Sequence, residues 1–160
     1  MKRRFLMIGF LNALLSFIIK PKSASATSKP LENYKTLTNS DWEKRLTKEA
    51  FYVLRKEGTE RPFSSSLNDE KRQGIFRCAG CGIALFSSET KFDSGTGWPS
   101  FFDHLPDAIE TKKDFKLIVP RTEYHCRRCG GHQGHVFNDG PRPTGKRYCN
   151  NGVALSFEAD

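Results

Sequence analysis

The sequence predicts a mainly β fold that begins with one helix. Three observations support this prediction. Residues 40–58 show helical hydrophobic spacing, short β-type runs follow Pro62, and clusters of Gly, Pro, Asn and Asp separate those runs. Strands joined by short turns pair antiparallel, so we expect an antiparallel body. The 160 residues suit one domain.

The first 26 residues have the layout of a secretory signal peptide. Basic residues open the chain, an apolar run extends over 5–19, and small residues end the segment at 23–26. We therefore predict export to a periplasm or lumen through a cleaved signal, and Arg3-Arg4 resembles a twin-arginine signal. The alternative is a membrane anchor formed by residues 5–19, although this run is short for a membrane span.

This segment also holds most of the formal charge. The chain carries a net charge of +8, but residues 1–26 contain five basic residues and no acid, so the remainder carries only +3. Such a small excess does not indicate nucleic-acid binding by itself. We therefore expect no nucleic-acid partner.

Residues 27–39 are polar, and we interpret them as a linker to a domain of residues 40–160. Ser40 and Glu43 have the spacing of a capping box, which predicts the start of a helix. Apolar residues then recur at helical spacing as far as Leu54, with Gly58 as the expected C′ residue that closes the helix. This stripe predicts core packing rather than a binding groove.

Short runs rich in β-branched and aromatic residues predict the strands. They cover residues 75–78, 84–86, 115–119, 123–126, 135–137 and 153–157. The domain is small, so a bound metal would help to stabilise it.

Four of the five cysteines form two Cys-x-x-Cys-Gly knuckles, Cys78 with Cys81 and Cys126 with Cys129. Each such turn points two sulfurs at one metal, and the glycine that follows permits the tight backbone. Together they predict a closed structural zinc site, with the knuckles on separate hairpins because a long segment separates them. The alternative is a pair of disulfides or redox-active pairs.

The fifth cysteine, Cys149, lies outside the knuckles in a polar stretch. Arg147 is positioned to favour the thiolate, which is the nucleophilic form, and Lys146 is a second candidate for this role. His132 and His135 lie just upstream and are candidates for a source of protons. The alternatives for this pair are a second metal site or two ordinary histidines. The alternative is an unreactive buried cysteine.

Glycines flank Trp98 in the segment 92–102, and Pro99 fixes the turn. Such a loop can expose one face of the indole, which suits a small apolar group beside a polarised sulfur. From these residues alone, a core position for Trp98 is the stronger interpretation.

Together these patches resemble the B-type methionine-R-sulfoxide reductases, over roughly residues 36–160. The matching segments are GTERPF (58–63), FDSGTGWPSF (92–101), CGGHQGHVF (129–137), DGP (139–141) and RYCNN (147–151). The resemblance implies a β-tent-like fold of two antiparallel sheets with peripheral helices. It also implies a peptide-methionine (R)-S-oxide reductase that acts on free or protein-bound methionine-R-sulfoxide.

The resemblance implies a role for each matching residue. Cys149 matches the nucleophile, which would become a sulfenic acid, and Trp98 matches the wall that receives the sulfoxide methyl group. The knuckle cysteines match structural zinc ligands. The remaining matches are the active-site histidines His132 and His135, an acid that supports them (Asp139), and the lining residues Arg147 and Asn151.

Two positions depart from the family pattern. Thr96 stands where many members carry a resolving cysteine, so we predict that an external thiol regenerates Cys149: glutathione with glutaredoxin, a thioredoxin-like protein or another small thiol. Gln133 stands where the family often has an apolar residue. We expect a monomer.

Two other functions remain open on the residues alone. A Cys₄ module that binds nucleic acid or protein would use the basic pair Arg127-Arg128. A thiol peroxidase would use Cys149 against a hydroperoxide rather than a sulfoxide.

Overall fold

Strands dominate the computed structural model, which describes residues 33–116 and 119–160. The predicted signal peptide and residues 27–32 of the predicted linker lie outside the described residues. Within the described ranges, no helix combines the length and the apolar character needed to cross a membrane.

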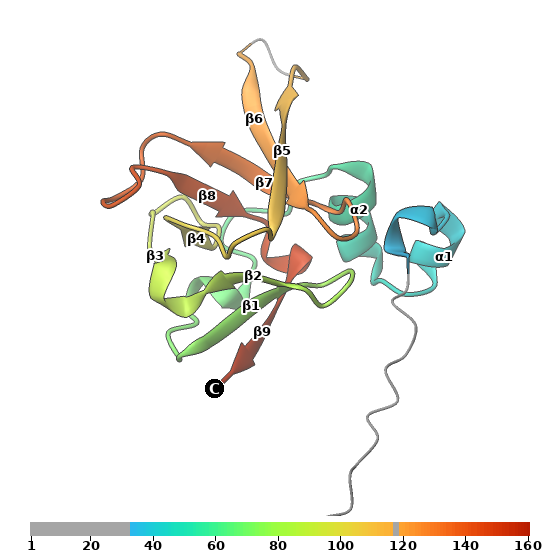
Figure 1. The fold of residues 1–160 in the computed structure, drawn as a ribbon, viewed down its shortest axis with the longest axis horizontal. Helices are drawn as coiled ribbons and strands as arrows, with labels where there is room; N and C mark the ends of the chain where they lie inside the picture. Colours follow the sequence, from blue (N-terminus) through green and yellow to red (C-terminus); the bar gives the residue numbers. More distant parts are fainter. Residues whose placement is uncertain (1–32, 117–118) are drawn as a thin grey trace, which may run out of the picture. The chain divides into compact units, whose positions relative to one another are not determined.

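The described strands form two antiparallel sheets, which confirms the predicted fold class (Figure 1). The smaller sheet has the order β2-β1-β9, and the larger has the order β3-β4-β8-β7-β6-β5. The bounds are β1 Gly74–Cys78, β2 Ala84–Ser87, β3 Lys91–Phe92, β4 Ser100–Phe101, β5 Ile109–Asp114, β6 Arg121–Cys126, β7 His132–Phe137, β8 Arg147–Asn150 and β9 Leu155–Ala159.

The helical region contains two helices, α1 (Asn39–Glu43) and α2 (Lys48–Lys56), so the prediction of one helix is wrong. The Thr47 hydroxyl accepts a hydrogen bond from the Ala50 backbone N–H at 3.1 Å and starts α2 as a separate helix. Short 3₁₀ turns complete the fold: η1 Tyr34–Thr36, η2 Ser66–Asn68, η3 Ser88–Thr90 and η4 Gly152–Ala154.

The predicted N-cap of this region is also wrong, whereas the predicted C′ residue is confirmed. Thr38 is the N-cap of α1 and forms a capping box with Asp41, which leaves Ser40 inside the helix. At the other end, Glu57 is the C-cap of α2, with a left-handed φ of 55°, so Gly58 is the C′ residue as predicted, and its N–H donates to the Tyr52 backbone oxygen at 3.0 Å.

The domain starts earlier than residue 40. The Tyr34 ring stacks on the buried Trp42 ring with centroids 6.0 Å apart. Residues 34–39 therefore pack as part of the domain, and the linker interpretation is wrong for them.

The predicted strand at 115–119 is wrong at residues 115, 116 and 119, while residues 117–118 lie outside the described residues. β5 ends at Asp114, and the side chains of Phe115 and Val119 are 72% and 71% exposed. The pairing of β5 with β6, from Ile109 opposite Cys126 to Asp114 opposite Arg121, sets this boundary. β5 reads IETKKD, so its sequence lacks the apolar alternation that would reveal a strand.

Aromatic rings from both sheets form the core between them. Phe86 of β2 stacks on Phe101 of β4 at 4.2 Å, and Phe76 of β1 meets Phe101 edge-on at 4.9 Å. All three side chains are fully buried, and each contributes about 1.5–3 kcal/mol relative to exposure. This packing joins the sheet that carries the first knuckle to the sheet that carries Cys149.

Candidate active site and metal centre

The two knuckles lie on separate hairpins, as predicted. Cys78 ends β1 and Cys126 ends β6, and the turns that follow lead into β2 and β7. Gly82 and Gly130 close these turns with φ of 73° and 70°, a conformation that favours glycine. The two turns therefore share one geometry.

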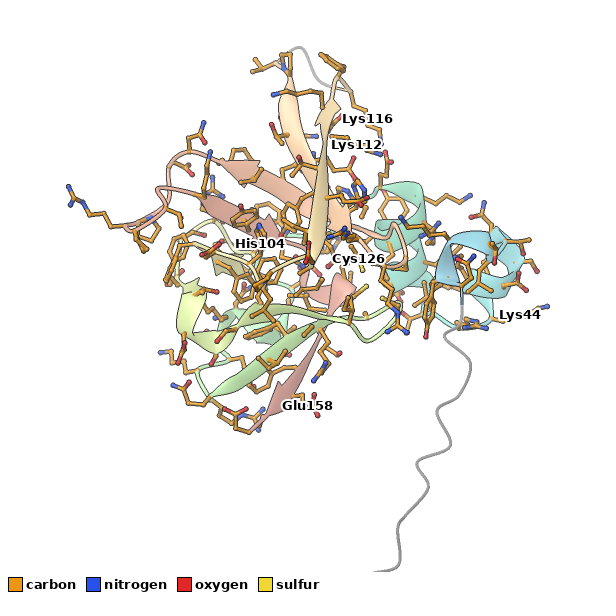
Figure 2. All side chains as sticks on the ribbon, viewed as in Figure 1. Lys44, His104, Lys112, Lys116, Cys126 and Glu158 are labelled. Atoms are coloured by element: carbon orange, nitrogen blue, oxygen red, sulfur yellow. The ribbon has the colours of Figure 1, made fainter. Side chains whose placement is uncertain are left out.

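The four knuckle sulfurs form one buried cluster, within 4.8 Å of one another. The Sγ atoms of Cys78 and Cys129 are 3.6 Å apart, and those of Cys81 and Cys126 are 3.5 Å apart. A disulfide needs about 2.05 Å, whereas tetrahedral zinc at about 2.3 Å places sulfurs roughly 3.8 Å apart. The spacing and the all-thiol donor set fit a metal ion such as zinc (Cys126 is labelled in Figure 2).

Cys149 lies apart from this cluster, on β8. Its Cα pairs with that of His135 on β7 and that of Ser100 on β4. Its partly exposed side chain lines a pocket of about 130 Å³ together with Trp98, His135 and Asn151. The other lining residues are Thr59, Arg121, Gly134, Phe137 and Asn150.

Burial of Cys149 opposes the expected lowering of its thiol pKa and outweighs it. Desolvation raises the pKa of the thiol, while Arg147 and then the Thr96 hydroxyl lower it by less. Lys146 Nζ donates instead to Asn138 Oδ1 at 2.6 Å. Arg147 therefore lowers the pKa of the thiol as predicted, against the larger effect of burial.

Asp139 pairs with Arg147 and not with the histidines, so its predicted supporting role is corrected. The Arg147 Nε and Nη2 atoms donate to the Asp139 carboxylate at 2.9 and 2.8 Å. The guanidinium also lies over the Phe137 ring, 4.3 Å from its centroid. Asp139 therefore orients the cation beside Cys149.

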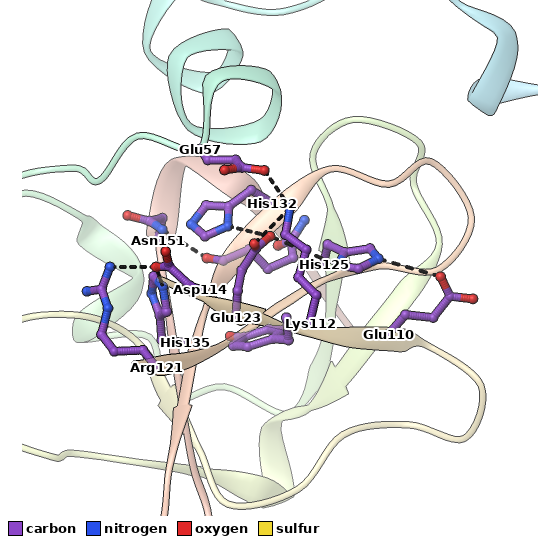
Figure 3. A network of polar contacts seen from close by, with 12 residues as sticks. Glu57, Glu110, Lys112, Asp114, Arg121, Glu123, His125, His132, His135 and Asn151 are labelled. Atoms are coloured by element: carbon purple, nitrogen blue, oxygen red, sulfur yellow. Dashed lines mark hydrogen bonds and ion pairs between the residues drawn. The ribbon is translucent and has the colours of Figure 1, made fainter. Parts of the chain in front are cut away.

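His135 is supported by Asp114 at the end of β5. Its Nε2 lies 2.8 Å from Asp114 Oδ2, and Arg121 Nη2 donates to the same oxygen at 2.7 Å (Figure 3). A carboxylate only accepts, so Nε2 carries the proton and Nδ1 is the nitrogen left for the pocket. Burial lowers the pKa of His135, with Asp114 opposing it less strongly.

His132 lies in a different place from His135. It is 2% exposed and does not line the pocket. Its Nδ1 is 2.9 Å from Glu123 Oε1, and Lys112 Nζ is 3.0 Å from Glu123 Oε2 and 2.6 Å from Glu57 Oε1 (Figure 3). Burial acts to raise the pKa of Glu123, but His132 and Lys112 together hold it low. His132 is thus a buried anchor for the strand that presents His135.

The segment 58–63 holds the Trp98 loop against the Cys149 strand. The Trp98 indole N–H donates to the Glu60 backbone oxygen at 3.2 Å, so the ring is half-buried and lines the pocket instead of entering the core. The Glu60 carboxylate accepts from the backbone N–H groups of Gly152 and Val153. The Glu60 N–H in turn donates to Asn151 Oδ1 at 3.0 Å.

Sequence reasoning missed the two carboxylates, Asp114 and Glu123, that hold the histidines. Asp114 lies in a strand without alternation. Glu123 was within a predicted strand, where an acid in a run expected to face a core was a usable signal.

The chain matches known proteins over most of its length. A family model described as the SelR domain matches residues 46–159. Peptide methionine sulfoxide reductase MsrB of Methanosarcina barkeri is 53% identical over 124 residues, which cover 77% of this chain and 87% of that protein. The MsrB of Methanosarcina mazei is 54% identical over 121 residues, which cover 75% of this chain and 86% of that protein.

A chloroplast protein is also similar. Peptide methionine sulfoxide reductase B1 of Arabidopsis thaliana is 45% identical over 140 residues, which cover 87% of this chain and 69% of that protein. The family model and these relatives agree on one assignment: the chain belongs to the B-type methionine-R-sulfoxide reductases, the peptide-methionine (R)-S-oxide reductases.

Proposed function

We propose that this chain reduces methionine-R-sulfoxide, free or in proteins, with Cys149 as the nucleophile and a sulfenic acid as the intermediate. One observation carries the proposal: Cys149 and His135 are cross-strand partners that line one pocket, and Trp98 lines the same pocket. A thiol, a proton carrier and an apolar wall are the three groups that sulfoxide reduction requires.

The protonation states suggest how the thiol is activated. At neutral pH the Cys149 thiol and the His135 imidazole are both neutral, because burial shifts their pKa values in opposite directions. His135 accepts the thiol proton, and the thiolate attacks the sulfoxide sulfur. His135 then returns the proton to the sulfoxide oxygen.

The products follow from this transfer. As the sulfur–oxygen bond of the substrate breaks, the oxygen moves to Cys149 as a sulfenic acid and methionine leaves. Arg147, held by Asp139, stabilises the thiolate during the attack. Trp98 receives the methyl group and selects between the two epimers at sulfur.

We also propose that one zinc ion occupies the Cys₄ cluster and has a structural role. Four thiolate ligands complete a tetrahedral shell, so the ion would clamp the β1–β2 and β6–β7 hairpins together and contribute folding free energy.

An external thiol completes the cycle. The four other cysteines lie in the metal cluster, and Thr96 contacts Cys149 where a resolving cysteine would stand. A first thiol attacks the sulfenic acid, releasing water and forming a mixed disulfide. A second thiol then frees Cys149 and leaves as a disulfide. Glutathione with glutaredoxin, a thioredoxin-like protein or a small thiol fits this role.

Mass spectrometry after one turnover without reductant tests the regeneration step. The wild type should gain one oxygen on Cys149, whereas Thr96→Cys should form a disulfide between positions 96 and 149. An internal disulfide to Cys149 in the wild type contradicts the external-thiol step.

Stereospecific turnover tests the function as a whole. Wild type should reduce the R but not the S epimer of methionine sulfoxide, and Cys149→Ser should reduce neither. Turnover of a hydroperoxide in preference to the sulfoxide contradicts the proposal.

We further propose that residues 1–26 direct export and are then removed, which places the substrate pool outside the cytoplasm. N-terminal sequencing of the protein recovered from cell fractions tests this. A cytoplasmic protein that retains Met1 contradicts export.

A further inference from the structure

Gln133 is a fully buried polar residue between the cluster of four knuckle sulfurs and β8, the strand that carries Cys149. It lies on β7 and has a side-chain exposure of 0%. A buried amide costs free energy unless its donor and acceptor groups are paired. The partners of Gln133 therefore indicate what this polar residue contributes.

Its amide reaches toward both sites. Nε2 donates to Cys78 Sγ at 3.4 Å, which is hydrogen-bond range for sulfur. Oε1 is 3.5 Å from Nδ2 of Asn150, the neighbour of Cys149. Asn150 is itself fixed, because its Oδ1 accepts from Tyr124 Oη at 2.7 Å and its Nδ2 donates to the Asn151 backbone oxygen at 2.7 Å.

The contact with Cys78 has a clear electrostatic consequence. Four thiolates around a divalent ion leave a net negative charge in a buried site, and such charge is costly without hydrogen-bond donors. A donor to a ligating sulfur lowers this cost and fixes the direction of its lone pairs. An apolar side chain at position 133, which the family pattern often has, would supply no donor.

We infer that Gln133 is a positioning residue for the metal: its amide stabilises the metal-bound Cys78 thiolate and slows loss of the ion. The inference rests on the zinc site of the proposed function. Through Asn150 the same side chain ties the cluster to β8, so the metal site and the catalytic strand share one buried polar link.

Zinc release from the purified holoenzyme tests this role. Gln133→Met keeps the side-chain volume and removes the donor. Transfer of zinc to a chromogenic chelator should be about tenfold faster or more in this variant. Thr47→Ala is the matched control, because it weakens the fold by removing a cap hydrogen bond, to the Ala50 N–H, that involves no knuckle residue. It should release zinc at the wild-type rate.

Alkylation of individual cysteines gives a second readout that general destabilisation would not move. In Gln133→Met, Cys78 should become the first knuckle cysteine to react with iodoacetamide, ahead of Cys81, Cys126 and Cys129. If Gln133→Met does not fold, Gln133→Leu takes its place with the same expectations.

The outcomes separate this inference from the function it rests on. Wild type that contains zinc, with equal release rates in Gln133→Met and wild type, overturns the role of Gln133 alone. Release accelerated equally in Gln133→Met and Thr47→Ala overturns it too. Wild type without zinc overturns the metal site and the inference together, while R-sulfoxide turnover tests the catalytic proposal separately.

Discussion

The five cysteines of this chain occupy two contrasting settings. Four lie at the turns of two hairpins, buried, with their sulfurs gathered within 4.8 Å. Cys149 lies in the middle of a sheet, with a pocket in front of it and His135 beside it. Each knuckle sulfur is surrounded by other sulfurs, whereas Cys149 faces a proton carrier and open space. In the proposed function the same side chain is a ligand in one setting and a nucleophile in the other, because its neighbours differ.

The two histidines show the same contrast on a smaller scale. His135 lines the pocket and is held by Asp114, whereas His132 is buried and is held by Glu123. Each carboxylate also forms an ion pair, Asp114 with Arg121 and Glu123 with Lys112. The two similar pairs therefore differ in position: the His135 imidazole lines the pocket, whereas the His132 imidazole is buried in the sheet.

Replacing Cys149 with serine should have the largest effect. We expect kcat/KM for methionine-R-sulfoxide to fall by roughly 10⁴-fold or more, because a hydroxyl is a far weaker nucleophile than a thiol. Zinc content and the denaturation midpoint should stay at wild-type values. A variant that keeps turnover would remove Cys149 from the chemistry.

Replacing Cys126 with serine should disrupt the cluster of four knuckle sulfurs. The cluster loses a ligand, so zinc should be lost and the free energy of unfolding should fall by about 5 kcal/mol. Metal analysis and guanidinium titration measure both. Full zinc content with an unchanged midpoint would contradict a structural metal.

Replacing the histidines separates their roles. His135→Gln should lower kcat by about 100-fold, since general acid–base catalysis typically contributes 10²- to 10⁴-fold. Asp114→Asn should lower it by about tenfold through misorientation of His135. His132→Gln should act mainly on stability. A larger loss of kcat in His132→Gln than in His135→Gln would mean that His132 is the proton carrier and His135 the buried support.

Replacing Arg147 with glutamine should shift the reactivity of Cys149 with pH. In the wild type the rate of alkylation rises with pH, because burial raises the pKa of the thiol and the thiolate forms only in alkaline solution. Arg147 lowers that pKa, so its loss should move the midpoint upward and slow alkylation at pH 8 by about threefold. A downward shift would mean that Arg147 does not stabilise the thiolate.

Replacing Thr47 with alanine should have the smallest effect. Loss of the α2 cap should lower the free energy of unfolding by about 1 kcal/mol, measured by urea denaturation. Zinc content and kcat/KM should not change, because the Thr47 hydroxyl bonds to the Ala50 N–H of its own helix and to no cysteine.

The sequence predicts those parts of the site that depend on local spacing. Each Cys-x-x-Cys-Gly turn needs only its own residues, so both knuckles are visible in the sequence, and Cys149 stands out as the remaining thiol. Trp98 was harder to place, because its half-buried position depends on a hydrogen bond to Glu60.

Features that depend on pairing between distant segments were not predictable in this way. Asp114 meets His135 only because β5, β6 and β7 are neighbours in the larger sheet. The prediction of the helix starts fails for a related reason. The sequence offers three suitable N-cap residues, Thr38, Ser40 and Thr47, and packing selects the two threonines. Competition between similar local signals is settled by tertiary contacts.

Chemical trapping during one turnover is the most direct test of the division between the four metal-binding cysteines and the single reactive one. The zinc-loaded wild type is mixed with one equivalent of methionine-R-sulfoxide and dimedone, without reductant, and peptides are mapped by mass spectrometry. We expect one dimedone adduct, on Cys149, with one zinc ion still bound per chain. Adducts on the knuckle cysteines, or zinc released in step with turnover, would contradict it.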